Sequence, residues 1–193
     1  MSEVEMDSVL GNMVRAIAML ESSRHFAGLI PEVRVNLVYA MPGAKGPGEV
    51  AAIDGRMTRV NGWPRASGLP AFGASDHMAR LIVEARKYDP SIRAGINFAW
   101  TPELLAWLVA RGMDPVEIDR SNEPPESAAG DGNSIPWKVA VVAASRPTFP
   151  RLFFENPAPG KEPLFVLVGA NALEVAARAC EIAAGFLRID ANV

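Results

Sequence analysis

The sequence predicts a layered α/β domain, and three of its features support this prediction. Segments with apolar residues at three- and four-residue spacing, typical of helices, interleave with segments in which every second residue is apolar, typical of strands. Residues 163–169 form an uninterrupted apolar run, as in a central strand covered on both faces. A chain of 193 residues can bury roughly 70% of its unfolded surface in one core. We therefore expect residues 1–193 to form a single domain.

The first third of the chain is expected to begin with a helix and to continue with strands. In residues 4–24 apolar side chains recur at alternating four- and three-residue steps, which predicts an amphipathic helix. One-by-one alternation predicts a strand over 32–40. Residues 41–48 contain three glycines and two prolines and are expected to form a loop, followed by short strands at 50–53 and 56–60.

The remainder of the chain continues the α/β pattern. Thr101 is a helix cap followed by Pro102 at the first helical position, and Gly112 closes this helix. Asn171 and Glu174 have the spacing of a capping box at the start of a last helix. The other expected elements are strands at 92–98, 116–119 and 152–155, a long polar loop at 121–134, a helix at 136–144 and the end of the last helix at 187.

Residues 67–77, Ser-Gly-Leu-Pro-Ala-Phe-Gly-Ala-Ser-Asp-His, lead into a predicted helix over 78–88. The glycines and the proline predict a loop without regular structure, and Ser75 is a good N-cap. Such a helix start offers open backbone N–H groups and the positive end of the helix dipole to an anion, with His77 beside it. The phosphate-binding residues expected here are Gly73, Ala74, Ser75 and Asp76. The alternative interpretation is an ordinary connection between a loop and a helix, with a surface histidine.

Composition and charge restrict the class of ligand. The net charge is −3, but residues 24–93 carry ten Lys and Arg residues against six Asp and Glu, which suits a small anionic ligand and not a nucleic acid. The single cysteine, Cys180, excludes an internal disulfide and is expected to be a buried, unreactive thiol. The chain has no apolar run long enough to cross a membrane and an acidic N-terminus, so we expect a cytoplasmic protein without a membrane partner.

The residues that several known classes of enzyme require are absent from the sequence. With only His25 and His77, the chain cannot supply the several histidines of a zinc aldolase site. The phosphate-binding loop of the P-loop kinases and the Gly-x-Gly-x-x-Gly dinucleotide fingerprint are both absent. Ser75 and His77 are too close in sequence to face each other on a helix as nucleophile and base.

Other charged residues are candidates for binding phosphate or metal. Arg56, directly after Gly55, could hold a phosphate with its planar guanidinium group, and Lys161 could reach one, although each could equally be a surface charge. Asp119 and Glu123 could hold a magnesium ion through water, although acidic loop residues are commonly only solvated. We expect the site where residues 41–48, 55–56, 68–77 and 160–163 converge, because these Gly- and Pro-containing loops carry the basic side chains.

Six segments follow one another in an unusual order: Pro31–Ala44, Gly55-Arg56, Gly68–His77, Asp89–Ala94, Ser134–Trp137 and Gly160–Pro163. Together they closely resemble the ThiN-type thiamine-phosphate synthase domain, over about residues 8–187. The resemblance implies a three-layer α/β/α fold with a mixed sheet, like the AraD-like aldolases and the C-terminal domain of hydroxymethylpyrimidine (HMP) phosphate kinase, but without the aldolase zinc site. It also implies the coupling of hydroxymethylpyrimidine diphosphate with hydroxyethylthiazole phosphate, which yields thiamine phosphate and pyrophosphate.

The functional arginine and histidine of that family fall on Arg56 and His77. We also assign Asn36, Gly43 and Lys161 to the binding of substrate or phosphate. No tightly bound cofactor or metal is expected, and magnesium would arrive with the diphosphate. The expected partners are small phosphorylated substrates, a second copy of the chain in a homodimer, and the HMP phosphate kinase to which this domain is usually fused.

Two differences from the family pattern leave a second hypothesis open. The sequence contains the synthase-like domain alone, and Asn156-Pro-Ala-Pro159 replaces a glycine-rich lead into residues 160–163. Some relatives attached to DNA-binding domains sense thiamine phosphate, so a non-catalytic module that binds thiamine phosphate or a related compound is the alternative to an enzyme. The presence of both Arg56 and His77, and of the N-terminal helix, favours the enzyme.

Overall fold

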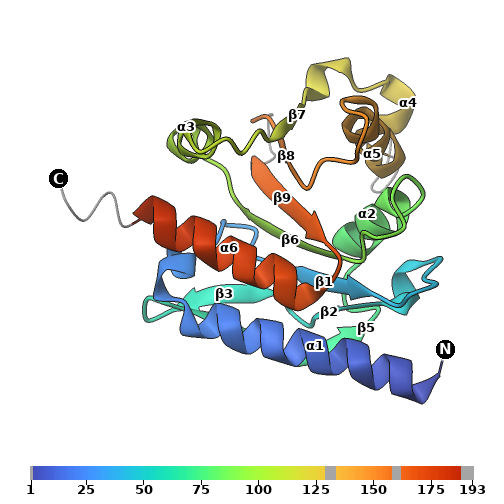
Figure 1. Ribbon diagram of the computed structural model, residues 1–193, viewed down its shortest axis with the longest axis vertical. Helices are drawn as coiled ribbons and strands as arrows, with labels where there is room; N and C mark the ends of the chain where they lie inside the picture. Colours follow the sequence, from blue (N-terminus) through green and yellow to red (C-terminus); the bar gives the residue numbers. More distant parts are fainter. Residues whose placement is uncertain (1, 129–133, 158–161, 188–193) are drawn as a thin grey trace.

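A seven-stranded mixed sheet forms the middle layer of the computed structural model, which describes residues 2–128, 134–157 and 162–187 (Figure 1). The strand order is β5-β2-β1-β6-β9-β8-β7, and every neighbouring pair is antiparallel except β7 and β8. The strands are β1 (Leu37–Ala40), β2 (Val50–Ile53), β5 (Pro70–Phe72), β6 (Ala94–Ala99), β7 (Val116–Ile118), β8 (Leu152–Glu155) and β9 (Leu164–Gly169). A separate hairpin joins β3 (Met57–Val60) to β4 (Trp63–Ala66).

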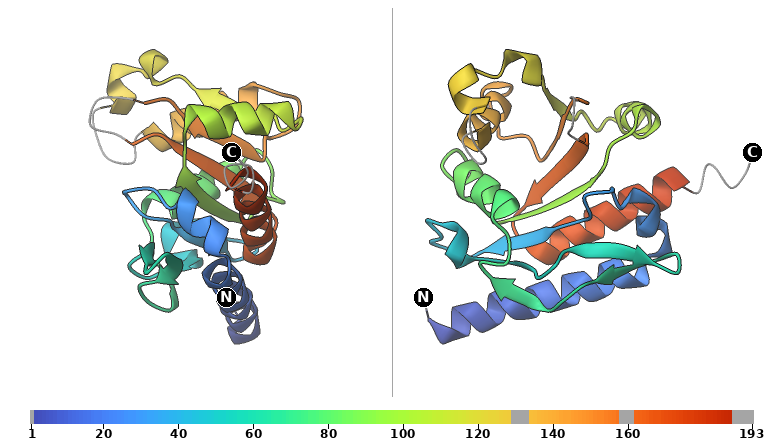
Figure 2. Two further views of the ribbon diagram at one scale, coloured as in Figure 1. Left: turned by 90° about the vertical axis from the view of Figure 1, so that its left-hand side faces the viewer. Right: turned by 180° about the vertical axis from the view of Figure 1, so that it is seen from behind.

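Helices cover both faces of the sheet, as the two further views show (Figure 2). The helices α1 (Glu3–Ser22) and α6 (Ala172–Leu187) pack together on one face, and α2 (His77–Ala85) and α5 (Ser134–Ala144) pack together on the other. The predicted three-layer α/β/α arrangement with a mixed sheet is therefore confirmed. The remaining elements are α3 (Pro102–Ala110), the short α4 (Pro125–Ala128) and the 3-10 helices η1 (Arg24–Leu29), η2 (Pro47–Glu49) and η3 (Arg120–Asn122).

Most predicted elements form where the local spacing placed them. Thr101 accepts a hydrogen bond from the N–H of Leu104 at the start of α3. At the start of α6, Asn171 accepts from the N–H of Glu174, while the Glu174 carboxylate accepts from the N–H of Ala170 and not from that of Asn171. The capping box is thus half formed. Strand β9 lies between β6 and β8, as the apolar run predicts.

Three local predictions are wrong. Residues 67–77 are not all loop, because Pro70–Phe72 pairs with β2 as edge strand β5, where a proline without an N–H is tolerated. The predicted strand over 32–40 is regular only at Leu37–Ala40. Strand β4 was not predicted, although Asn61 and Gly62 both adopt positive φ in a two-residue turn, the strongest short hairpin signal.

Close contact between α2 and β6 sets the position of the site. A Cβ atom at Gly95 would lie 2.8 Å from Cδ1 of Ile82, so any larger residue would require the Ile82 side chain to shift. Just after α2, the Arg86 side chain donates to the backbone oxygen of Pro42, which follows β1. The C-terminal end of α2 therefore lies over that end of the sheet, and its N-terminal end, with His77, points toward the opposite end.

No helix in the described part of the chain is both long and apolar enough to cross a membrane. Cys180, in α6, is half-buried, and burial raises the pKa of its thiol. The thiol is thus protonated at neutral pH, as expected for an unreactive structural cysteine.

Candidate functional site

The start of α2 places His77 at the surface, as the first residue of the helix. The predicted cap is wrong: Asp76, not Ser75, precedes the helix, and it makes no capping hydrogen bond with its side chain. Instead, the Asp76 carboxylate accepts from Arg80 at 2.7 Å, while Ser75 is 7% exposed. With no side-chain cap, the first N–H groups of α2 remain available to an external acceptor.

The phosphate-binding role predicted for Gly73–Asp76 applies to only part of that segment. The N–H of Gly73 already donates to the backbone oxygen of Val50 at 3.0 Å. For the N–H groups of residues 74–78, in contrast, the described chain supplies no acceptor. A helix start with free N–H groups attracts anions, so these residues and His77 form one half of the candidate site.

The predicted convergence of four loops is only partly correct, because they lie at two ends of the sheet. Beyond β2 at Val50, residues 41–48 meet Gly73, whose Cβ position would lie 3.9 Å from Cα of Gly48. Gly43 belongs to this group and is exposed. Residues 55–56 follow the other end of β2, beside Val33.

Arg56 follows the C-terminal end of β2, in an unusual backbone conformation. Gly55 and Arg56 both have positive φ, of 71° and 68°. For Arg56 this conformation is strained, since a left-handed residue with a side chain costs about 1–2 kcal/mol. Its guanidinium donates to the backbone oxygen of Val33 at 2.6 Å. Strain retained at an exposed arginine is common at functional sites.

Glu162 stabilises the segment around Val33, to which Arg56 also binds. Its two carboxylate oxygens accept from the N–H groups of Glu32 and Val33 at 2.8 and 2.9 Å. Arg56 and Glu162 thus both bind the Val33 segment, which joins the described part of 160–163 to residues 55–56. Gly160 and Lys161 lie outside the described residues.

The predicted substrate-binding residue Asn36 lies on the sheet face that α2 covers. Gly95 faces α2 and pairs with Val38, so Asn36 and Asn97, each two residues away, share that face. Asn97 accepts from the N–H of Asn36 at 2.7 Å and donates to the oxygen of Arg34 at 3.0 Å. Oδ1 of Asn36 is buried and has no hydrogen-bond partner in the described structure. It is therefore an acceptor that a ligand could use.

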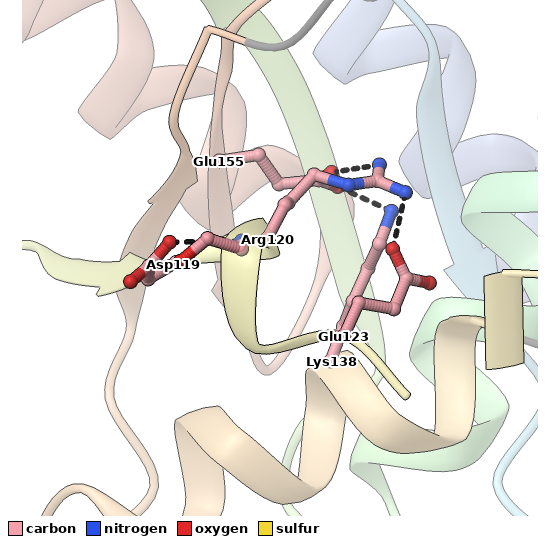
Figure 3. A network of polar contacts seen from close by, with 6 residues as sticks. Asp119, Arg120, Glu123, Lys138 and Glu155 are labelled. Carbon is pink, nitrogen blue, oxygen red and sulfur yellow. Dashed lines mark hydrogen bonds and ion pairs between the residues drawn. The ribbon is translucent and has the colours of Figure 1, made fainter. Parts of the chain in front are cut away.

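A buried network of charged side chains lies on this same face (Figure 3). Arg120 bridges Glu155 at 2.7 Å and Glu123 at 2.6 Å, and Lys138 of α5 donates to the other Glu155 oxygen at 2.7 Å. Burial alone would raise the pKa of Glu155, but the charges of Lys138 and Arg120 outweigh it and hold that pKa below its usual range. The Glu155 carboxylate is therefore ionised at neutral pH.

Asp119 and Glu123, the carboxylates suggested for a magnesium ion, both have partners within the chain. Asp119 accepts from the N–H of Ser121 and from the Asn122 amide, which caps η3, and Glu123 is ion-paired to Arg120. The described residues include no group of three or more His, Cys, Asp and Glu side chains placed to hold a metal ion.

The pKa of His77 depends on burial and on charged side chains from several elements. Although its side chain is exposed, surrounding protein displaces enough water to lower its pKa, and the charges of Lys138 and Arg56 lower it further. Glu155 and Asp76 act in the opposite direction but are outweighed. The pKa of His77 therefore lies below 6.5, and the imidazole is neutral at pH 7.

We expect acid to destabilise the wild type more than His77→Gln. Because the pKa of His77 is lower in the folded than in the unfolded chain, its contribution is fully present above pH 6.5 and is lost as pH falls through the folded pKa. Urea unfolding at intervals from about pH 7 to pH 5 measures the unfolding free energy of both proteins as a function of pH. Parallel curves of unfolding free energy for the two proteins would contradict the lowered pKa.

Comparison with known proteins decides the family. The model of the family described as thiamine-phosphate synthase ThiN matches residues 12–181. The chain belongs to the ThiN family. Thiamine-phosphate synthase ThiN of Methanothermobacter thermautotrophicus is 37% identical over 171 residues, which cover 89% of this chain and 90% of that protein. The bifunctional thiamine biosynthesis protein ThiDN of Methanocaldococcus jannaschii is 29% identical over 174 residues, but these are only 40% of its length.

Solved structures agree with the ThiN assignment. The C-terminal domain of a phosphomethylpyrimidine kinase superposes with a TM-score of 0.82 at 29% identity, over 92% of this chain and all of that domain. The C-terminal domain of protein MJ0236 superposes with a TM-score of 0.83 at 28% identity, over 95% of this chain and 97% of that domain. This ThiN chain therefore has the fold of domains that occur in kinase-linked relatives.

Sequence reasoning missed the charged network of this ThiN domain. One signal was available: Lys138 lies on the stripe of α5 that also contains Ile135, Val139 and Val142. A lysine on an otherwise apolar helical face needs a partner in the core. That its partner is Glu155, from a strand formed 17 residues later, could not be read from local spacing.

Proposed function

We propose that this ThiN chain is a thiamine-phosphate synthase that uses Arg56 and His77 to couple hydroxymethylpyrimidine diphosphate with hydroxyethylthiazole phosphate. The products are thiamine phosphate and pyrophosphate. Family membership supports the reaction. The observation that supports the site is the start of α2, where backbone N–H groups without an acceptor in the described chain lie beside His77.

The chemistry needs stabilisation of a leaving group more than it needs a nucleophile from the protein. The methylene carbon attached to the pyrimidine ring supports positive charge, so the bond to the diphosphate can break ahead of attack by the thiazole nitrogen. Negative charge then grows on the departing pyrophosphate. An enzyme accelerates such a step by placing donors where that charge develops and by holding the attacking nitrogen in line.

The chain offers suitable groups for both tasks. Arg56 binds only a backbone oxygen through its side chain in the described structure, so it can exchange Val33 for a phosphate oxygen and bring a full positive charge. Neutral His77 donates one N–H, and the free N–H groups at the start of α2 bind a phosphate of either substrate. Asn36, Gly43 and Lys161 complete the proposed substrate contacts.

The metal and the partners follow from the same proposal. Magnesium is expected to arrive with the diphosphate. One relative is the bifunctional thiamine biosynthesis protein ThiDN, and its fused arrangement supports an HMP phosphate kinase as the functional partner of this chain. A homodimer remains a prediction that light scattering of the purified protein can measure.

Release of pyrophosphate, measured with both substrates and magnesium, tests the proposed function. The enzyme hypothesis expects turnover that requires both substrates. The sensing hypothesis expects binding of thiamine phosphate in calorimetry and no pyrophosphate. Zero turnover of a folded wild-type protein under these conditions would overturn the synthase assignment for this chain.

A further inference from the structure

One buried carboxylate oxygen in the charged network has no partner. The Glu123 side chain is only 5% exposed, and its Oε2 accepts from Arg120 at 2.6 Å. Its other oxygen, Oε1, is buried and accepts no hydrogen bond in the described structure. Figure 3 shows this second oxygen pointing away from Arg120. An ionised carboxylate can accept several hydrogen bonds, so this oxygen is an acceptor that the described structure leaves unused.

The network holds this oxygen in place. Arg120 donates to Glu123 through one nitrogen and to Glu155 through another, and the second oxygen of Glu155 accepts from Lys138. The two positive and two negative charges balance within the network. The free oxygen of Glu123 is therefore a pre-positioned acceptor, and no additional positive charge is needed to neutralise it.

The same network borders the proposed reacting centre. Lys138 belongs to α5, which packs against α2, and the charges of both Lys138 and Glu155 affect the pKa of His77. Glu123 is thus connected to α5, the neighbour of α2, through three successive ion pairs that also involve Arg120, Glu155 and Lys138. A substrate bound at His77 is expected to reach this part of the site.

Only one of the two proposed substrates can supply the missing donor. The pyrimidine carries an exocyclic amino group with two N–H donors. The thiazole phosphate has no donor on its ring or side chain, and its phosphate would be repelled by a carboxylate. We propose that Glu123 is a specificity residue whose Oε1 accepts a hydrogen bond from the amino group of the pyrimidine substrate, an inference that rests on the proposed function.

An analogue of the pyrimidine diphosphate with hydrogen in place of the amino group tests this proposal. We expect the wild type to prefer the natural substrate by about 10- to 100-fold in kcat/KM, the range for a hydrogen bond to a charged group. In Glu123→Gln this preference should nearly disappear. Glutamine has one acceptor oxygen, so when that oxygen faces Arg120 an NH2 donor occupies the place of Oε1 and cannot accept from the amino group. The KM for the thiazole phosphate should change little.

The matched control is Glu155→Gln, which disturbs the same network at a residue whose oxygens both have partners. It is expected to lower activity but to keep the preference for the amino group. A preference retained by folded Glu123→Gln, or lost equally in both variants, would overturn the proposal. If Glu123→Gln does not fold, the wild type still decides, because equal kcat/KM for the two pyrimidines also overturns it.

Failure of the proposed function would have a different signature. If the wild type releases no pyrophosphate, calorimetry with the pyrimidine diphosphate and its analogue replaces kinetics. Tighter binding of the amino compound by the wild type, lost in Glu123→Gln, would support the role of Glu123 without catalysis. Equal binding of the two compounds by the wild type would overturn it.

Discussion

Arg56→Ala is expected to lower kcat for pyrophosphate release about a hundredfold. A charge-assisted donor to an oxygen that becomes negative in the transition state contributes about 3 kcal/mol, which corresponds to that factor. Arg56→Lys should recover only part of the rate, because an ammonium group keeps the charge and loses the two-pronged geometry. Steady-state kinetics with saturating thiazole phosphate measures both effects.

Two substitutions at Arg56 distinguish an effect on catalysis from an effect on stability. Arg56→Ala loses the hydrogen bond to Val33 and keeps the positive φ, so it should cost about 1 kcal/mol of unfolding free energy. Arg56→Gly also relieves the left-handed strain and should be close to the wild type in stability while equally inactive. Arg34→Gly is the matched control, because Arg34 is also exposed with a φ of 69°. Full activity in folded Arg56→Ala would refute the site.

His77→Ala should reduce coupling to a similar extent, about a hundredfold, through loss of its hydrogen bond to a phosphate oxygen. The neutral imidazole lies at the surface, so truncation opens no core cavity and should change stability by less than about 1 kcal/mol at pH 7. His77→Asn, which keeps a side-chain donor, is expected to retain more activity than alanine.

The other histidine supplies the control for this prediction. His25 lies in η1, is exposed, and belongs to a different part of the chain. His25→Ala should leave kcat unchanged within about twofold. A loss in His25→Ala as large as in His77→Ala would mean that the assay reports general damage, and a fully active His77→Ala would remove His77 from the mechanism. Thermal unfolding of each variant shows whether it is folded.

Local spacing was sufficient for the α/β class and for most helices, because one buried stripe and a few capping residues specify a helix within one segment. Thr101 with Pro102 predicted the start of α3, and the apolar run 163–169 predicted the buried strand β9. Ser75 shows the limit of such rules, because its side chain is buried and the helix begins two residues later, at His77. The edge strand at Pro70–Phe72 likewise formed against the local signals, because β2 offers it a free edge.

The motifs of the sequence were also sufficient to suggest the ThiN family and to select Arg56 and His77, since both lie in short segments of unusual composition. The lowered pKa of His77 depends on burial by elements that pack around α2 and on the charge of Lys138, which belongs to α5. The network around Glu123 joins residues from η3, α5 and β8. Electrostatic interactions of this kind depend on distance in space, so only the folded arrangement of these segments could establish them.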